Sequence, residues 1–417
     1  MSVRAVLSRR LALNRASARA PRLPHRFPRL IVMALFSMGT GVALVGCGGS
    51  GGGDDEADLI SAFNVVGQSD YTQGSPNAGA TAAATTMAQP LGNVAVDGQR
   101  LFVADTANNR VLGYNMIPDA PGAAADFVLG QDGFSGNLAG TTQSRMALPS
   151  AVFIGEGRLV VADSGNNRVL IWNSIPSATG TLPDVVVGQD TFTTSLSGTS
   201  ATTFSYPTSA VIANGRLLVA DQNNNRVLVW STVPASNGAA ADMVLGQQDF
   251  STRDDDDEAE EMNRPASVWS DGFRLLVADS GNHRVLYWSL FPQQSGAEAD
   301  YVIGQSDFSR SSAGTSSSTL RTPFGVAADG TRVYVADSGN NRVLEFDSFP
   351  ISNGPAASDV FGQEGFSNNT ANDNDQDGDV DDNPNQRTLS GPSGVFVYSG
   401  VLYVSDRNNN RVMMFPQ

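Results

Sequence analysis

The sequence contains no lysine, one cysteine and two histidines, and these shortages exclude several kinds of site. The single cysteine is Cys47, and only His283 lies beyond the N-terminal segment, so zinc sites built from histidine and cysteine are excluded. All 26 basic residues are arginine. Eight of them lie in the first 46 residues, which hold none of the 42 acidic residues. The rest of the chain therefore has a formal charge of −24, which argues against nucleic acid as a partner.

The N-terminal segment has the organisation of an export signal. A basic stretch precedes an apolar run over residues 30–45, which is too short to favour a membrane span. The run closes on LVGC at residues 44–47, which resembles the lipobox of bacterial lipoproteins. The resemblance implies a signal peptide over residues 1–47 and lipidation of Cys47. It also implies an outer-membrane location, because Gly48 and not Asp follows the cysteine. An ordinary signal sequence that ends near a free cysteine is the alternative.

A short phrase that recurs six times organises residues 62–417. It reads LFVADTANNRVLGY in its first copy and VYVADSGNNRVLEF in its fifth, and such repetition indicates an array of equivalent structural units. The aspartates of the phrase are spaced by 58 residues, except in the last interval, which is 69. They are Asp105, Asp163, Asp221, Asp279, Asp337 and Asp406. Residues 48–61, rich in glycine and acidic side chains, are expected to form a flexible tether before the array.

Each unit predicts four short strands. Two runs rich in β-branched residues flank the Gly/Asn turn of the phrase and predict a hairpin, a third run follows an upstream proline, and a fourth ends in Gly-Gln. Four antiparallel strands per unit are typical of a β-propeller blade, so we expect an all-β fold with six four-stranded blades. The sixth unit lacks its Gly-Gln strand, whereas a spare one, FNVVGQ, occurs at residues 63–68. We expect this N-terminal strand to close the last blade in a 3+1 arrangement, because an open ring would expose a strand edge.

The repeated pattern, a proline strand such as PFGVAADG followed by VYVADSGNNRVLEF, resembles the NHL repeat over residues 63–416. The resemblance implies a six-bladed propeller, in agreement with the count of strands. It implies no single activity, because NHL propellers include protein-binding, RNA-binding, sensor and lyase domains. The zinc-dependent amidating-lyase branch is excluded, since the repeat array holds one histidine.

The residues that recur in every unit are predicted to be structural. A residue needed six times, such as Asp163, Asn167 or Arg168, performs the same task in each blade, and Asp and Asn suit a tight hairpin turn. His283 takes the place of the second turn Asn in the fourth unit, and we interpret it as a turn substitution. An aromatic residue follows each arginine by four positions and is predicted to pack between blades, although a ring of sugar-stacking platforms is an alternative. These residues are Tyr114, Trp172, Trp230, Trp288, Phe346 and Phe415.

The units differ mainly in the long connections between each Gly-Gln and the next proline, which we expect to emerge on one face of the ring together with the hairpin turns. Two connections are strongly acidic. One contains DDDDEAEE at residues 254–261, and the other contains DNDQDGDVDD at residues 373–382, within an insert over residues 366–388 that holds the extra residues of the long interval.

The second acidic segment resembles a calcium-binding loop of the EF-hand type. Carboxylates occupy alternate positions, and Gly378 stands at position six, where a sharp turn is needed. The segment departs from the pattern at position twelve, where Pro384 replaces the bidentate Glu. We predict a Ca²⁺ site here, with a solvated acidic loop as the alternative. The candidate ligands are Asp373, Asp375, Asp377, Asp379 and Asp381.

These features predict a cell-envelope lipoprotein whose propeller is a rigid binding scaffold. It would be a monomer that meets the membrane only through its lipid anchor and engages a protein or glycan of the envelope through the acidic, long-loop face. An alternative is a calcium-dependent hydrolase or lactonase with its site in the central channel. That enzyme would need Asp, Glu or Asn side chains from several inner strands, and the proline strands supply few besides Asn93. A structural spacer without a ligand is a third possibility.

Overall fold

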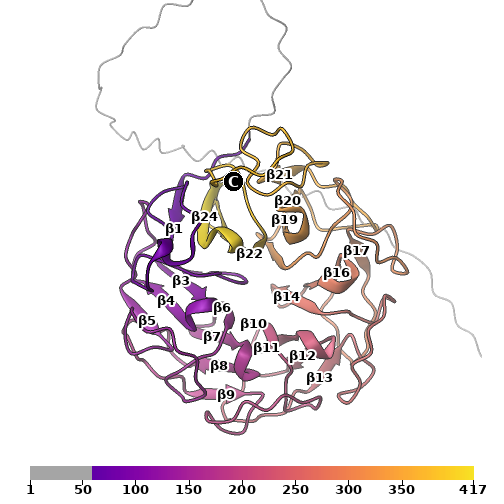
Figure 1. Cartoon of the computed structure of the whole chain (residues 1–417). Coiled ribbons are helices and arrows are strands. Elements are labelled where there is room, and N and C mark those ends of the chain that lie inside the picture. The colour runs from indigo at the N-terminus through magenta and orange to yellow at the C-terminus, as the bar shows by residue number, and fades with distance from the viewer. Residues whose placement is uncertain (1–58) are drawn as a thin grey trace, which may run out of the picture. The chain divides into compact units, whose positions relative to one another are not determined.

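A computed structural model describes residues 59–417 of the chain. The predicted signal peptide, Cys47 and most of the tether lie outside the described residues. Six four-stranded antiparallel sheets surround a central axis as the blades of a propeller (Figure 1). No helix in the described part of the chain has the length and hydrophobicity needed to cross a membrane. The predicted fold class, blade count and strand count are confirmed.

The strands of each blade follow the chain from the axis to the rim. Blade 1 consists of β2 (Ala95–Asp97), β3 (Arg100–Asp105), β4 (Arg110–Tyr114) and β5 (Phe127–Leu129). Blade 2 consists of β6 (Pro149–Gly155), β7 (Arg158–Asp163), β8 (Arg168–Trp172) and β9 (Val185–Val187). Blade 3 consists of β10 (Pro207–Ala213), β11 (Arg216–Asp221), β12 (Arg226–Trp230) and β13 (Met243–Leu245). Blade 4 consists of β14 (Pro265–Ser270), β15 (Leu275–Asp279), β16 (Arg284–Trp288) and β17 (Tyr301–Ile303).

The last two blades complete the ring. Blade 5 consists of β18 (Gly325–Ala328), β19 (Val333–Asp337), β20 (Arg342–Phe346) and β21 (Asp359–Phe361). Blade 6 consists of β22 (Pro392–Tyr398), β23 (Val401–Asp406), β24 (Arg411–Pro416) and the N-terminal β1 (Asn64–Val66). A single 3₁₀ turn connects the second and third strands of every blade. These turns are η2 (Thr106–Asn108), η3 (Ser164–Asn166), η4 (Gln222–Asn224), η5 (Ser280–Asn282), η6 (Ser338–Asn340) and η7 (Arg407–Asn409), and a further one, η1 (Pro76–Gly79), follows β1.

The ring closes as the sequence predicts. β1 pairs with β24 in antiparallel register, with Val65 opposite Met413 and Val66 opposite Val412, so the two ends of the described chain meet in blade 6 (Figure 1). The Arg411 guanidinium also donates to the Tyr71 carbonyl at 2.5 Å. The predicted 3+1 closure is therefore confirmed, and the segment after β1 is tied to blade 6 as well.

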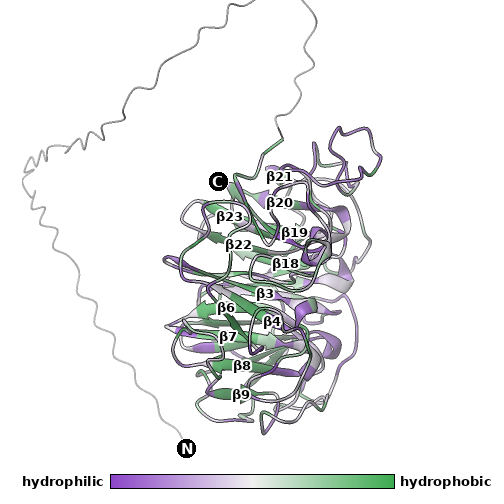
Figure 2. Cartoon of the chain, turned by 60° about the vertical axis from the view of Figure 1, so that its left-hand side comes forward, coloured by the Kyte–Doolittle hydropathy of each residue, from purple (hydrophilic) through white to green (hydrophobic). Residues whose placement is uncertain are grey.

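The hydrophobic core consists of six clusters, each between two neighbouring blades. Val65 belongs to the cluster between blades 5 and 6, and Val66 belongs to the cluster between blades 6 and 1. The repeated aromatic residues lie in these clusters with exposed fractions of 0–3%, so they pack between blades and the sugar-stacking alternative is wrong. Figure 2 shows the hydrophobic strands between hydrophilic turns and loops.

Each repeated aspartate and arginine forms an ion pair that is fully buried, with N···O distances of 2.6–2.8 Å. In blade 3, Asp221 also accepts from the Asn224 amide at 2.8 Å and from the Ser205 N–H at 2.7 Å. Arg226 donates to the carbonyls of Phe250 and Ser200 in the long connections on either side of the blade. The ion pair thus anchors the hairpin to the long loops, which confirms the structural interpretation of these residues.

The second Asn of each turn connects neighbouring blades. It adopts the left-handed conformation, and its side chain accepts the N–H of the residue that precedes the next proline, as in Asn225 and Arg264 at 2.8 Å. His283 has the same conformation, with φ 54°, and its Nδ1 accepts the Thr322 N–H at 3.0 Å. Burial and, to a smaller extent, Arg321 lower the pKa of His283, which favours the neutral ring that this bond requires. The predicted turn substitution is therefore confirmed.

Candidate functional site

The inner strands pack tightly where blades 6 and 1 meet. A Cβ at Gly394 would lie 1.8 Å from the Gly92 carbonyl oxygen, so these two backbones touch across the boundary between blades 6 and 1. The Asn93 side chain accepts the Val395 N–H at 3.0 Å and donates to the Val326 carbonyl at 3.4 Å. Asn93, the polar residue that the sequence places at the channel, therefore holds three blades together.

No group of three carboxylates converges in the central channel of the described structure. Residues 59–417 bring three acidic or metal-ligating side chains within reach of one ion at one place, and that place is in the acidic insert. The carboxylates of the inner strands therefore form no metal-binding group within the described residues, and the hydrolase alternative gains no support from them.

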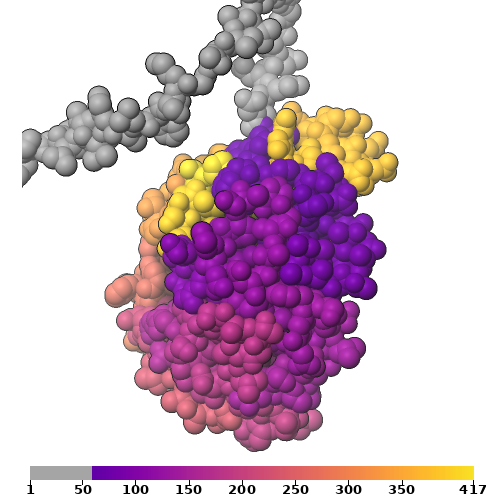
Figure 3. All heavy atoms as spheres, turned by 90° about the vertical axis from the view of Figure 1, so that its left-hand side faces the viewer, coloured from indigo at the N-terminus to yellow at the C-terminus, as the bar shows by residue number. Residues whose placement is uncertain are grey.

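The acidic insert projects from the rim of the ring, where it forms the yellow-orange lobe in Figure 3. One oxygen from each of Asp373, Asp375 and Asp377 lies within 4.8 Å of the others. Ligand oxygens at 2.3–2.6 Å from one Ca²⁺ can have this separation. Asp373 is 1% exposed, and although its Oδ2 accepts the Gly378 N–H at 3.0 Å, its Oδ1 is buried without a partner.

The structure brings together three of the five predicted metal ligands. Asp381 accepts the Asn374 N–H at 2.6 Å, and neither it nor Asp379 belongs to the group. Gly378 has φ 95°, so the turn at position six is as sharp as the sequence predicts. An unpartnered buried carboxylate oxygen is costly, and an ion held by Asp373, Asp375 and Asp377 would satisfy it.

The other acidic segment, residues 254–261, lies over the hairpin of blade 4. Asn282 in the hairpin turn donates to the Asp256 carbonyl at 2.7 Å, and Arg284 donates to the Glu258 carbonyl at 2.9 Å. The hairpin turns and the long connections therefore share one face of the ring, which we call the long-loop face. Burial and the neighbouring Asp256 and Glu260 raise the pKa of Glu261, because like charges are close together here.

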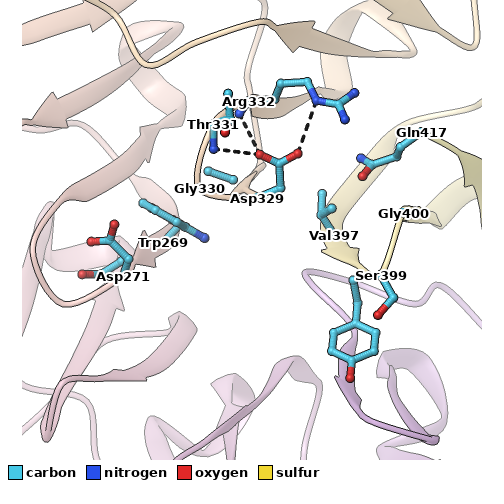
Figure 4. A pocket seen from close by; sticks show the side chains of 13 residues that line it. Trp269, Asp271, Asp329, Gly330, Thr331, Arg332, Val397, Ser399, Gly400 and Gln417 are labelled. Carbon is cyan, nitrogen blue, oxygen red and sulfur yellow. Dashed lines mark hydrogen bonds and ion pairs between the residues drawn. The ribbon is translucent and has the colours of Figure 1, made fainter. Parts of the chain in front are cut away.

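The opposite face holds the larger cavity, of about 800 Å³, among the turns between first and second strands of blades 4, 5 and 6 (Figure 4). Trp269 and Gln417 lie on opposite sides of it. Its acidic groups take part in turns: Asp329 accepts the N–H groups of Thr331 and Arg332 at 2.8 and 2.7 Å and pairs with the Arg332 guanidinium. The charges in this cavity are therefore neutralised locally.

A smaller cavity of about 340 Å³ lies where the central axis meets the long-loop face. Its lining includes the 3₁₀ turns and the residues just before the prolines. Sequence reasoning missed these residues because they are the variable neighbours of the repeated ones. The signal for them is that variability: the position after the repeated Asp is Thr, Ser, Gln, Ser, Ser and Arg in the six units.

The fold defines the class of protein, a six-bladed β-propeller closed by its N-terminal strand. No protein-family model and no curated protein matches the chain, so the NHL resemblance stays a prediction. Among solved structures, an auxiliary nutrient binding protein from Bacteroides ovatus is 13% identical over 86% of this chain and 76% of its own, with a TM-score of 0.47. Kuenenia stuttgartiensis hydrazine synthase is 13% identical over 89% of this chain and 99% of its own, with a TM-score of 0.44. The computationally designed Ika8 protein is 10% identical over 78% and 71%, with a TM-score of 0.38. Likeness at this level carries no activity or ligand over to this chain.

Proposed function

We propose that this chain is a cell-envelope lipoprotein whose propeller is a rigid binding scaffold, with a protein or glycan partner on the long-loop face. One observation carries the proposal. The residues that recur in every blade have structural roles, whereas the residues that differ between blades lie on the long-loop face. The repeated Asp and Arg side chains are fully buried in ion pairs, while the connections between blades are long and partly exposed. Residues that vary on a rigid frame are the usual carriers of recognition.

Calcium binding to the acidic insert is part of this proposal. Asp373, Asp375 and Asp377 would hold one Ca²⁺, and the ion would fix the insert against the rim. The support is the buried Oδ1 of Asp373, which has no hydrogen-bond partner, together with the convergence of the three carboxylates. Oxygen ligands of this kind in extracellular modules bind Ca²⁺ with a Kd of about 10⁻⁴–10⁻³ M.

We expect calorimetry to detect one Ca²⁺ per chain in this affinity range, and we expect the double variant Asp375→Ala and Asp377→Ala to lose the binding heat. The matched control is Asp254→Ala with Asp255→Ala, which removes the same charge from the other acidic segment. Both of those aspartates are exposed and belong to no group of converging carboxylates in the described structure. Indistinguishable titrations of the wild type and the Asp375/Asp377 variant would refute the site.

The scaffold itself is tested with the same two variants. We expect the immobilised protein to retain a specific protein or glycan from isolated cell envelopes, and to retain less of it when the insert is altered or Ca²⁺ is chelated. Failure to retain any envelope component with Ca²⁺ present would favour the structural spacer and contradict the binding function.

The lipid anchor rests on Cys47 and the LVGC sequence that ends at it. We expect Cys47→Ser to abolish labelling of the protein by a radioactive fatty acid and to release it from the membrane fraction into the soluble one. Unchanged labelling and fractionation of this variant would contradict a lipoprotein.

A further inference from the structure

The cavity on the long-loop face differs from the cavity on the opposite face because its charged side chains form no ion pairs with other described residues. It is lined by Arg264 and Arg407, and within residues 59–417 neither guanidinium forms an ion pair or a hydrogen bond. The cavity lining contains no carboxylate. In the cavity of Figure 4, by contrast, Arg332 pairs with Asp329 and with Glu345. The long-loop cavity therefore keeps two positive charges free, and we call it the arginine mouth.

The frame of the propeller holds the backbone of both arginines in place. Arg264 lies before Pro265, and its N–H is held by Asn225, while Arg407 is the first residue of the turn η7 (Arg407–Asn409). Arg264 and Tyr206, which lines the same cavity, have φ values of 53° and 58°. The residue before the proline is left-handed in the other blades too, where it is Gln89, Leu148, Thr322 or Gly391. The repeated fold therefore fixes the backbone conformation of Tyr206 and Arg264, which line the cavity.

The remaining lining is suited to a small hydroxylated ligand. The side chains of Tyr206, Gln222 and Ser280 line the cavity and form no hydrogen bond within the described chain. Leu91, which is 6% exposed, and the half-buried Phe324 supply apolar surface. The volume of about 340 Å³ lies at the lower end of the range for small-molecule sites.

The charges of the chain and of the cavity lining indicate the size and charge of the ligand. The whole chain has a formal charge of −16, and both acidic segments belong to connections on the long-loop face, so a large polyanion is repelled. Two guanidinium groups and no carboxylate line the cavity, so its lining favours one small anion. Guanidinium groups match the planar, two-oxygen geometry of a carboxylate. The free hydroxyl and amide groups match hydroxyls on the same ligand.

We propose that the arginine mouth binds a hydroxylated organic acid the size of one sugar unit, such as a uronate, with its carboxylate between Arg264 and Arg407. Tyr206, Gln222 and Ser280 contact its hydroxyl groups. This inference rests on the proposed scaffold function and specifies its ligand. It predicts that an acidic sugar, and not its neutral counterpart, is what the long-loop face recognises.

The test is a calorimetric titration of the purified full chain with glucuronate, glucose and inorganic phosphate. We expect glucuronate to bind at least tenfold more tightly than either of the others. Each of Arg264→Gln and Arg407→Gln should weaken glucuronate binding about tenfold or more, because a hydrogen bond to a charged group contributes about 1.5–3 kcal/mol. Both arginines are exposed, so the variants are expected to keep the wild-type melting temperature.

The matched control is Arg253→Gln, which removes an exposed positive charge from a long connection outside the cavity lining. It should leave glucuronate binding unchanged, and an equal loss in this variant would show a bulk effect of charge and overturn the site. Phosphate binding as tight as glucuronate, or no glucuronate binding, would also overturn the inference. Calcium titration of the same samples separates the two proposals, because intact Ca²⁺ binding without glucuronate binding refutes the arginine mouth alone.

Discussion

Removal of residues 59–70 is expected to destroy most of the stability of the propeller. This deletion takes away β1, whose Val65 and Val66 are fully buried and belong to two different core clusters. Full burial of one valine contributes about 1.5–3 kcal/mol. The deletion also removes the buried Gln68, whose amide donates to the Asn410 carbonyl at 3.0 Å in blade 6. Together these losses come to about 4–7 kcal/mol, which lies near the lower end of the stability of a typical domain, about 5–15 kcal/mol.

The measurement is thermal unfolding followed by circular dichroism, with a chain that begins at Leu59 as the matched control. We expect the melting temperature to fall by at least about 10 °C relative to that control, or the shortened chain not to fold. The bare edge of β24 should also cause self-association, visible in size-exclusion chromatography. Should the shortened chain fail to fold, the milder double variant Val65→Ala and Val66→Ala should still fold and unfold at lower denaturant concentration. An unchanged midpoint in that variant would contradict the closure of the ring by β1.

The fold could be predicted from the sequence because the pattern that encodes one blade occurs six times in the chain. Each copy of the phrase repeats the hairpin, its flanking strands and the buried Asp–Arg pair, so a local misassignment in one unit is corrected by the others. The exceptions lie at the axis, where the inner strands of blades 1 and 5 begin at Ala95 and Gly325, later than their prolines. The close approach of Gly92 to Gly394 and the bonds of Asn93 displace these segments from regular pairing. Contacts between units of this kind are not contained in any single repeat.

The candidate sites were less predictable from the sequence than the fold, because they depend on which side chains from distant segments come into contact. Alternation of aspartates predicts the acidic insert, but it does not show that the Asn374 N–H binds Asp381 while Asp373 stays buried and unsatisfied. The arginine mouth combines Tyr206, Arg264 and Arg407, which are far apart in the sequence and belong to no motif. Only the closure of the ring places them around one cavity. The sequence signal that could have identified these residues is a position that differs between units and lies next to a residue that all units share.

Substitution of one repeated aspartate, Asp221→Ala, is expected to destabilise the protein by about 3–5 kcal/mol. The change leaves the Arg226 guanidinium, which is fully buried, without its anion. It also removes the acceptor of the Asn224 amide and of the Ser205 N–H. Breaking a buried ion pair by removing one partner is costly because the remaining charge cannot be solvated.

Urea unfolding of Asp221→Ala measures this loss, and Asp307→Ala provides the matched control. Asp307 also pairs with an arginine, Arg310, but both side chains are largely exposed, with exposed fractions of 45% and 67%. An exposed pair contributes at most about 1 kcal/mol, so the control should unfold near the wild-type midpoint. If both variants unfolded at the wild-type midpoint and Asp221→Ala instead lost ligand binding, the repeated aspartates would be functional residues. A large loss of stability in Asp221→Ala alone is expected, because the six Asp–Arg pairs hold the frame from which the variable side chains project.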